Sequence, residues 1–151
     1  MNWLVVLFSE KTRETLSLHW FGLTQIPVLF YFGVSVTEIS KERMVVRIPL
    51  RRRTKNHLGS MYLGALCAGA DLASGLNAAR LTHDRHPKVK LVFADLRADF
   101  LKRADGDVVF RSRDGRRIAE AVRSADATGE RVTLPVEVVA TVPRKYGDEP
   151  V

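Results

Sequence analysis

The feature that most constrains this chain is a stretch of small and apolar side chains, residues 58–79, with one charged residue, Asp71. A helix of this length could cross a bilayer. Its four glycines, Asp71 and Asn77 make it a poor membrane span, because a carboxylate at the bilayer centre costs about 2.5 to 3.5 kcal/mol. The stretch therefore predicts a long helix, about residues 60–81, inside a domain where small side chains let another element or a ligand come close.

The chain length and the cysteine content set the class of protein. A chain of 151 residues is long enough for one domain with a proper core and too short for two, so we expect a single domain over residues 1–151. Cys67 is the only cysteine, which excludes an internal disulfide framework and favours a reducing, cytoplasmic location. The apolar run 3–8 is too short for a signal peptide and leads directly into polar residues.

The net charge of +7 suits either a polyanionic partner or a general bias towards arginine. The polyanion could be nucleic acid, anionic lipid or a phosphate-bearing molecule such as coenzyme A. The one basic cluster, residues 51–55, has no interleaved aromatic side chains to stack on bases, so no nucleic acid partner is expected. No membrane partner is expected either. The cluster fits coenzyme A phosphates or a solvated strand end. No metal site is expected either, because His83 and His86 lack partners at metal-ligand spacing.

The segments before the long helix predict one helix and two strands. Residues 9–23 have helical spacing, with Ser9 as the N-cap. The segment VLFYFGVSV, residues 28–36, is predicted to lead into a strand, and MVVRIPL, residues 44–50, is predicted to form the next one.

The segments after the long helix predict most of a sheet. Residues 88–103 alternate like a long strand, and residues 107–113 read as its hairpin partner. A short helix is predicted near residues 116–127. The last strand is expected at residues 132–142, where Pro135 indicates an edge or a bulge. The class is α+β, with one antiparallel sheet packed against one long apolar helix.

The residues at the start of the long helix follow the spacing N-x-x-G-[ST]-x-x-x-G-x-x-x-x-x-x-D, formed by Asn56, Gly59, Ser60, Gly64 and Asp71. This spacing resembles the hotdog-fold acyl-CoA thioesterases of the phenylacetate-pathway type, and most closely an uncharacterised bacterial branch of that superfamily. The order of helices and strands is similar over nearly the whole chain. The resemblance implies a hotdog fold, a curved antiparallel sheet wrapped around the central helix.

The residue types in this motif suit thioester hydrolysis. Ser60 is expected to cap the helix, which leaves the backbone amides near Gly64 free to stabilise the oxyanion of a thioester. Asn56 would orient the reacting group, and Asp71 would serve as general base or nucleophile. No cofactor is expected, with the acyl-CoA as substrate. The expected substrate-binding residues are Gly59, Tyr62, Leu63 and Phe93.

The spacing along the helix then predicts a site shared between two subunits. Gly64 and Asp71 are seven residues apart, which separates them by about 10 Å along one helix. Groups that must each contact one thioester cannot be this far apart, so we expect Asp71 to work with the helix start of a partner. The resemblance implies the same arrangement, in a homodimer or a dimer of dimers.

Two departures from the family keep a second function open. Active relatives commonly carry His-Gly-Gly where this chain has Tyr62-Leu63-Gly64, and Phe93 replaces a serine or threonine near the start of the following strand. The protein is therefore predicted to be an acyl-CoA thioesterase or a catalytically weak acyl-CoA or fatty-acyl binding protein. Asp71 could also be a structural carboxylate that binds amides or an arginine, Asn56 a turn residue, and Tyr62 a packing residue of the dimer interface.

Overall fold

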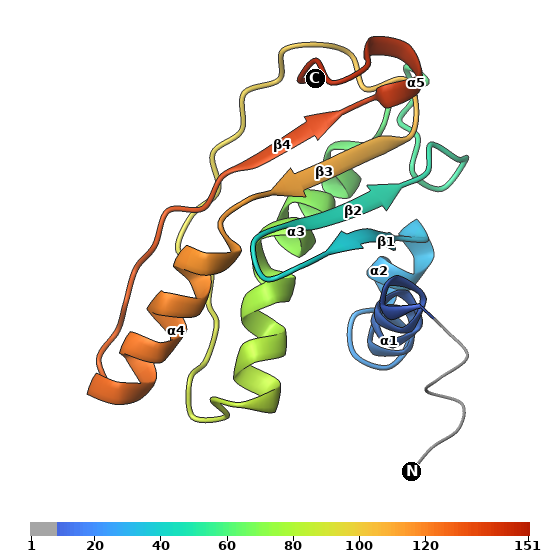
Figure 1. The fold of residues 1–151 in the computed structure, drawn as a ribbon. Coiled ribbons are helices and arrows are strands. Elements are labelled where there is room, and N and C mark those ends of the chain that lie inside the picture. The colour runs from blue at the N-terminus through green and yellow to red at the C-terminus, as the bar shows by residue number, and fades with distance from the viewer. Residues whose placement is uncertain (1–8) are drawn as a thin grey trace.

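The computed structural model describes residues 9–151 apart from the side chain of Asp84, so the apolar run 3–8 lies outside the described residues. Four strands form one antiparallel sheet in the order β1-β2-β3-β4 (Figure 1). β1 and β2 form a hairpin, and β3 lies between β2 and β4. The strands are β1 (Ser35–Ile39), β2 (Met44–Ile48), β3 (Val108–Ser112) and β4 (Val138–Thr141).

The long helix predicted from the small-residue stretch is α3 (Leu63–Asp84), and it crosses one face of the sheet (Figure 1). Small side chains bring it close to the strands: Ala65 and Ala73 are buried against the core. A methyl group on Gly69 would lie 2.2 Å from the ring of Phe110 on β3. The close approach expected from the glycines is therefore present. The sheet and this central helix confirm the predicted α+β hotdog fold.

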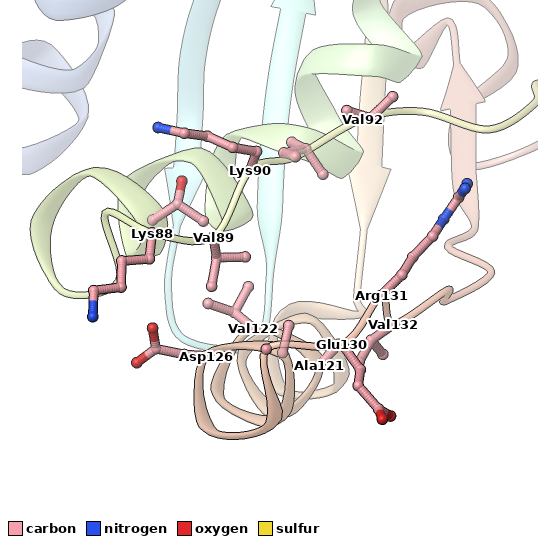
Figure 2. A pocket seen from close by; sticks show the side chains of 14 residues that line it. Lys88, Val89, Lys90, Val92, Ala121, Val122, Asp126, Glu130, Arg131 and Val132 are labelled. Atoms are coloured by element: carbon pink, nitrogen blue, oxygen red, sulfur yellow. The ribbon is translucent and has the colours of Figure 1, made fainter.

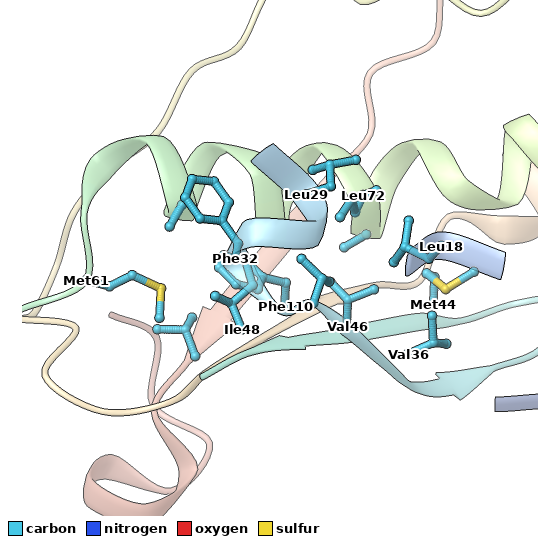
Figure 3. Close-up of a cluster of buried hydrophobic side chains, with 14 of the residues drawn as sticks. Leu18, Leu29, Phe32, Val36, Met44, Val46, Ile48, Met61, Leu72 and Phe110 are labelled. Atoms are coloured by element: carbon cyan, nitrogen blue, oxygen red, sulfur yellow. The ribbon is translucent and has the colours of Figure 1, made fainter. Parts of the chain in front are cut away.

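The hydrophobic core fills the space between α3, the sheet and the two N-terminal helices (Figure 3). Alternate residues of β2 point into it, with Met44, Val46 and Ile48 fully buried. Helix α1 (Glu10–Thr24) begins after Ser9, whose hydroxyl accepts a hydrogen bond from the Thr12 amide as an N-cap should. The helix predicted at residues 9–23 is thus confirmed.

The segment VLFYF leads into strand β1 as predicted, but it forms a short helix of its own, α2 (Pro27–Phe32), which was not predicted. Pro27 starts the helix where a missing N–H costs nothing, and Gly33 ends it with a left-handed φ of 65°. Leu29 and Phe32, three residues apart, both bury their side chains in the core. An apolar run of this length fits a strand or a buried helix, and the flanking proline and glycine decide between them here.

The long strand predicted at residues 88–103 is not formed. These residues are extended but belong to no strand, and β3 pairs with β2 and β4 instead of with them (Figure 1). The last strand is also shorter than predicted, because β4 begins at Val138, after Pro135. Alternation gives a segment the right faces for a sheet, but a strand exists only where a neighbour completes its ladder of hydrogen bonds.

The helix predicted near residues 116–127 is α4 (Gly115–Thr128), which ends at Gly129 with a φ of 71°. A further short helix, α5 (Pro143–Tyr146), follows β4 and was not predicted. The chain then returns to the sheet edge, where the Val151 amide donates to the carbonyl of Ala140. Among residues 9–151, no helix has both the length and the apolar character needed to cross a bilayer.

Candidate functional site

The loop between β2 and α3 forms a tight turn centred on the side chain of Asn56. The Asn56 carboxamide oxygen accepts hydrogen bonds from the backbone amides of Leu58, at 2.9 Å, and Ser60, at 3.1 Å. The turn passes through Gly59, whose φ is 79°. Asn56 is therefore a turn residue, which is one of the two roles that the sequence left open for it. Because its oxygen already accepts two bonds, the amide nitrogen is the part of this side chain that can bind a substrate.

Ser60 does not cap α3, contrary to the prediction. Its hydroxyl accepts a hydrogen bond from Nε of Arg103 at 2.6 Å, and its carbonyl accepts one from the Asn56 amide at 2.7 Å. Both contacts hold Ser60 in the turn, so the helix begins three residues later, at Leu63. Tyr62 occupies the N-cap position, and its side chain makes no capping hydrogen bond.

Arg103 is a part of this loop that the sequence did not reveal. Besides Ser60, its guanidinium also donates to the carbonyl of Leu58, so one side chain bridges both ends of the turn. Arg103 lies 43 residues after Ser60 and belongs to no local motif. In the sequence, Arg103 appears only as part of a basic pair with Lys102 at the end of residues 88–103. This signal is too weak to predict a contact with the loop.

The first turn of α3 has the free amides that the oxyanion prediction requires. The amides of Ala65 and Leu66 donate to the Tyr62 carbonyl, whereas the Gly64 amide has no acceptor among residues 9–151. A free amide at this position is directed out of the helix at the positive end of its dipole. This is the electrostatic arrangement that stabilises a developing oxyanion.

The Tyr62 ring lies against Gly64. A methyl group on Gly64 would be only 2.4 Å from Cε1 of Tyr62, so glycine is what allows the ring to fold over the helix start. The ring itself remains about half exposed, at 52%, as does Leu63 at 54%. Tyr62 and Leu63 thus present apolar surface next to the Gly64 amide.

Asp71 lies on an exposed part of α3 and has no partner within the described chain. No arginine, lysine or backbone amide in residues 9–151 forms an ion pair or hydrogen bond with its carboxylate. Partial burial without a compensating partner raises the pKa of Asp71 above its ordinary value of 3.8. A structural carboxylate would be held by such partners, so their absence from the described residues weakens the structural alternative.

Phe93 lies one helical turn beyond Asp71. A methyl group on Gly75 would be 3.0 Å from the Phe93 ring, and Gly75 follows Asp71 by four residues on the same helix face. Phe93 remains half exposed, at 52%. The extended segment after α3 therefore runs past the face that carries Asp71.

The predicted site residues fall into two groups. Asn56, Gly59, Tyr62, Leu63 and Gly64 gather at the start of α3, and Asp71 and Phe93 lie further along it. Because α3 is continuous from Leu63 to Asp84, the seven residues from Gly64 to Asp71 span about 10 Å, as predicted. Seven residues are nearly two full turns, so both groups lie on about the same side of the helix. A single chain does not bring them together.

A cavity away from this site lies between the segment after α3 and helix α4 (Figure 2). It measures about 520 Å³ and lies between the extended segment that contains Val89 and Val92 and the α4 residues around Val122. Its charged side chains, such as Lys88 and Asp126, lie at its rim (Figure 2). Among the side chains that the structure describes, no three from His, Cys, Asp or Glu gather as they would around a metal ion.

Comparison with known proteins places the chain in a family. Residues 18–148 match the family model described as "Domain of unknown function (DUF4442)", so the protein belongs to this family. No match is found among curated protein sequences.

Several solved structures are similar over most of their length. A protein of unknown function from Chlorobaculum tepidum has a TM-score of 0.67 at 14% identity, covering 86% of this chain and 80% of its own. Zebra fish thioesterase superfamily member 2 has a TM-score of 0.62 at 14% identity, covering 95% and 93%. A thioesterase from Haemophilus influenzae has a TM-score of 0.56 at 13% identity, covering 87% and 80%. These similarities establish the hotdog fold for this chain.

Proposed function

We propose that the protein is an acyl-CoA thioesterase that hydrolyses a thioester to coenzyme A and a free acid, at sites shared between two subunits. The observation that carries the proposal is the pair of unpartnered groups on one helix. The Asp71 carboxylate and the Gly64 amide both lack partners in the described chain, and they are about 10 Å apart. The fold and the thioesterases among its structural neighbours support the same chemistry.

The exposed segment after α3, residues 88–103, supports the proposal that a second subunit completes the site. Val92, Leu96 and Phe100 alternate on one side of it and are 78%, 62% and 59% exposed. The same segment has no strand partner within the described chain. An alternating apolar segment with free backbone groups is a surface that a second copy of the chain can complete by strand pairing. Because this segment runs past Asp71, pairing here would bring the partner close to that carboxylate.

The proposed reaction assigns one task to each group. Asp71 of one subunit takes a proton from water while the water oxygen forms a bond to the thioester carbonyl carbon. The Gly64 amide of the partner donates to the oxyanion that forms, and the Asn56 amide nitrogen orients the reacting group. The carbon–sulfur bond then breaks, and the thiolate takes the proton from Asp71. The products are the free acid and coenzyme A, and no cofactor takes part.

One observation favours a second candidate, an acyl-CoA or fatty-acyl binding protein with little turnover. The Tyr62 ring lies over Gly64, at the helix start where the oxyanion would bind. If the ring stays there when the ligand binds, the cleft would hold an acyl-CoA without stabilising the transition state. Tyr62 is half exposed, so its ring is also free to swing away.

Purified protein assayed against acyl-CoAs of graded chain length separates the two candidates. Thiol release is followed for turnover, and equilibrium binding is measured with the same ligands. The thioesterase proposal predicts turnover that is lost in the Asp71→Asn variant. Tight binding without thiol release would instead support the binding protein, and neither binding nor turnover would refute both.

A further inference from the structure

The two N-terminal helices carry an apolar surface that the proposed thioester site does not use. Residues 15–34 contain no Asp, Glu, Lys or Arg. Much of this uncharged stretch faces solvent, with Trp20 69% exposed and Tyr31 54% exposed. The lipid-facing patch, as we name it, consists of Leu16, Trp20, Phe21, Leu23, Ile26, Val28, Phe30 and Tyr31. This many exposed large apolar side chains on two adjacent helices indicate an interaction surface.

Part of the patch forms a stripe on α1, and α2 adds to it. Leu16, Trp20 and Leu23 are spaced by four and three residues, so they form one stripe on α1. α2 follows α1 after a short connection and adds Phe30 and Tyr31. The opposite side of the two helices is fixed to the domain, since His19 Nε2 bonds the Val34 carbonyl at 2.7 Å and Leu18 is buried.

The charges next to the patch are cationic. Arg51, Arg52 and Arg53 follow β2, and the Arg53 guanidinium lies 5.6 Å from the centre of the Tyr31 ring. In residues 9–151 none of these three arginines forms an ion pair. Arg13, one turn before Leu16 on the same stripe, is exposed as well.

The acidic side chains of α1 are directed away from the patch. Glu10 and Glu14 both pair with Arg80 on α3, at 3.2 and 3.3 Å. Their charge is therefore compensated within the domain, and the surface around the aromatic side chains keeps a net positive character.

We propose that the lipid-facing patch and the Arg51–Arg53 cluster form a docking surface for a membrane that contains anionic lipids. Tryptophan, tyrosine and phenylalanine side chains partition to the bilayer interface, and arginines beside them are attracted to anionic headgroups. The two helices lie in the interface and do not span the bilayer. This changes the expectation, drawn from the sequence, that the protein has no membrane partner.

The position of the patch keeps this surface separate from the proposed dimer. α1 and α2 lie beside β1, at the sheet edge opposite β4 (Figure 1). The extended segment proposed to pair with a second copy lies on the β4 side (Figure 1). A dimer formed there leaves the lipid-facing patch uncovered. Docking does not depend on the thioesterase proposal.

Sedimentation of the full chain with vesicles of phosphatidylcholine containing phosphatidylserine tests the proposal. The protein should sediment with these vesicles, and salt should weaken the binding. Trp20→Ser combined with Leu23→Ser should weaken it by about tenfold or more, because two interfacial side chains are lost. Arg51→Glu combined with Arg52→Glu should weaken it by about tenfold or more as well.

The matched control is Arg113→Glu combined with Arg123→Glu, which makes the same charge change on exposed residues at the β3–α4 junction and on α4. This control should bind more tightly than the Arg51/Arg52 variant. All variants should keep the melting temperature of the wild type, because the replaced side chains are exposed. Equal weakening in the control would mean that net charge alone attracts the protein, which would overturn the assigned surface.

Tryptophan fluorescence gives an independent readout of the patch. In a Trp3→Phe background, the fluorescence emission of Trp20 should shift to shorter wavelength on vesicle binding. Lipids with brominated acyl chains should quench this emission. Vesicle binding without this change, or no sedimentation at all, would refute the proposal. It would also be refuted if Trp20 became buried without vesicles as protein concentration rose, since the occupant would then be a second copy of the chain.

Discussion

Replacing Asp71 with asparagine separates a catalytic carboxylate from a structural one, because the two roles predict opposite effects on stability. The substitution keeps the side-chain volume and removes the charge. In the structure, the Asp71 carboxylate accepts no hydrogen bond and forms no ion pair within residues 9–151. No such contact is therefore lost, and we expect the free energy of unfolding to change by less than about 0.5 kcal/mol.

The raised pKa of Asp71 fixes the sign of any change with pH. Burial disfavours the charged form in the folded protein, so the folded-state pKa lies above the ordinary value of 3.8. The protonated carboxyl is therefore the more stable form, and its contribution is lost as the pH rises through the folded-state pKa. At neutral pH the Asp71→Asn variant should be as stable as the wild type or slightly more stable. The difference should vanish below pH 3.8.

The same variant should lose most of its activity. A positioned general base contributes about a hundredfold or more to the rate, so kcat should fall by at least that factor. The assays are thiol release from an acyl-CoA and chemical unfolding at neutral and acidic pH. A loss of about 1 to 3 kcal/mol in stability, the scale of a broken network of buried hydrogen bonds, would refute the catalytic assignment.

Further predictions address the loop, the pH profile and the assembly. Asn56→Asp keeps the oxygen that accepts the Leu58 and Ser60 amides but loses the amide donor, so it should keep the melting temperature and lose turnover, whereas Asn56→Ala should lower both. Thr54→Val should cost about 1 to 3 kcal/mol in unfolding experiments, because the buried Thr54 hydroxyl bonds the Pro49 carbonyl at 2.7 Å and the Arg51 amide at 2.8 Å. kcat/KM should fall as the pH drops through the raised pKa of Asp71. If kcat/KM fell only below pH 3.8, the result would contradict Asp71 as the general base. Light scattering at micromolar concentration should give a dimer or a multiple of one, and a stable monomer would contradict the shared site.

The elements predicted correctly from the sequence are those with local signals. α1 and α4 have helical spacing together with Ser9 at one start and Gly129 at the other end. α3 has its long run of small residues, although its start moved to Leu63 because Ser60 binds Arg103 instead of capping the helix. Local patterns predict the helix, but a distant side chain decides where it begins.

Residues 88–103 show where local patterns are insufficient. Their alternation is real, with Val92, Leu96 and Phe100 on one side, but alternation does not supply a strand partner. The helix α2, which precedes the predicted strand, was also missed, because a short apolar run has the same appearance in a strand and in a buried helix. In both cases the outcome depends on contacts with distant parts of the chain or with another chain.

The candidate site was predictable to the extent that it is contiguous. The motif from Asn56 to Asp71 identified the loop, the helix start and the carboxylate together. The contact of Arg103 with this loop and the position of the Tyr62 ring over Gly64 could not be predicted. Both depend on side-chain placement across the fold, which spacing along the sequence does not encode.

The most direct test of the shared site is activity in mixed dimers. Asp71→Asn subunits are combined with Asn56→Asp subunits, each nearly inactive alone. In a mixed dimer, one site receives Asp71 and Asn56 from unmutated positions, so each mixed dimer should recover about half of the wild-type activity of a two-site dimer. No recovery, with mixed dimers demonstrated by mass spectrometry, would contradict the claim that each site joins Asp71 of one subunit to the helix start of its partner.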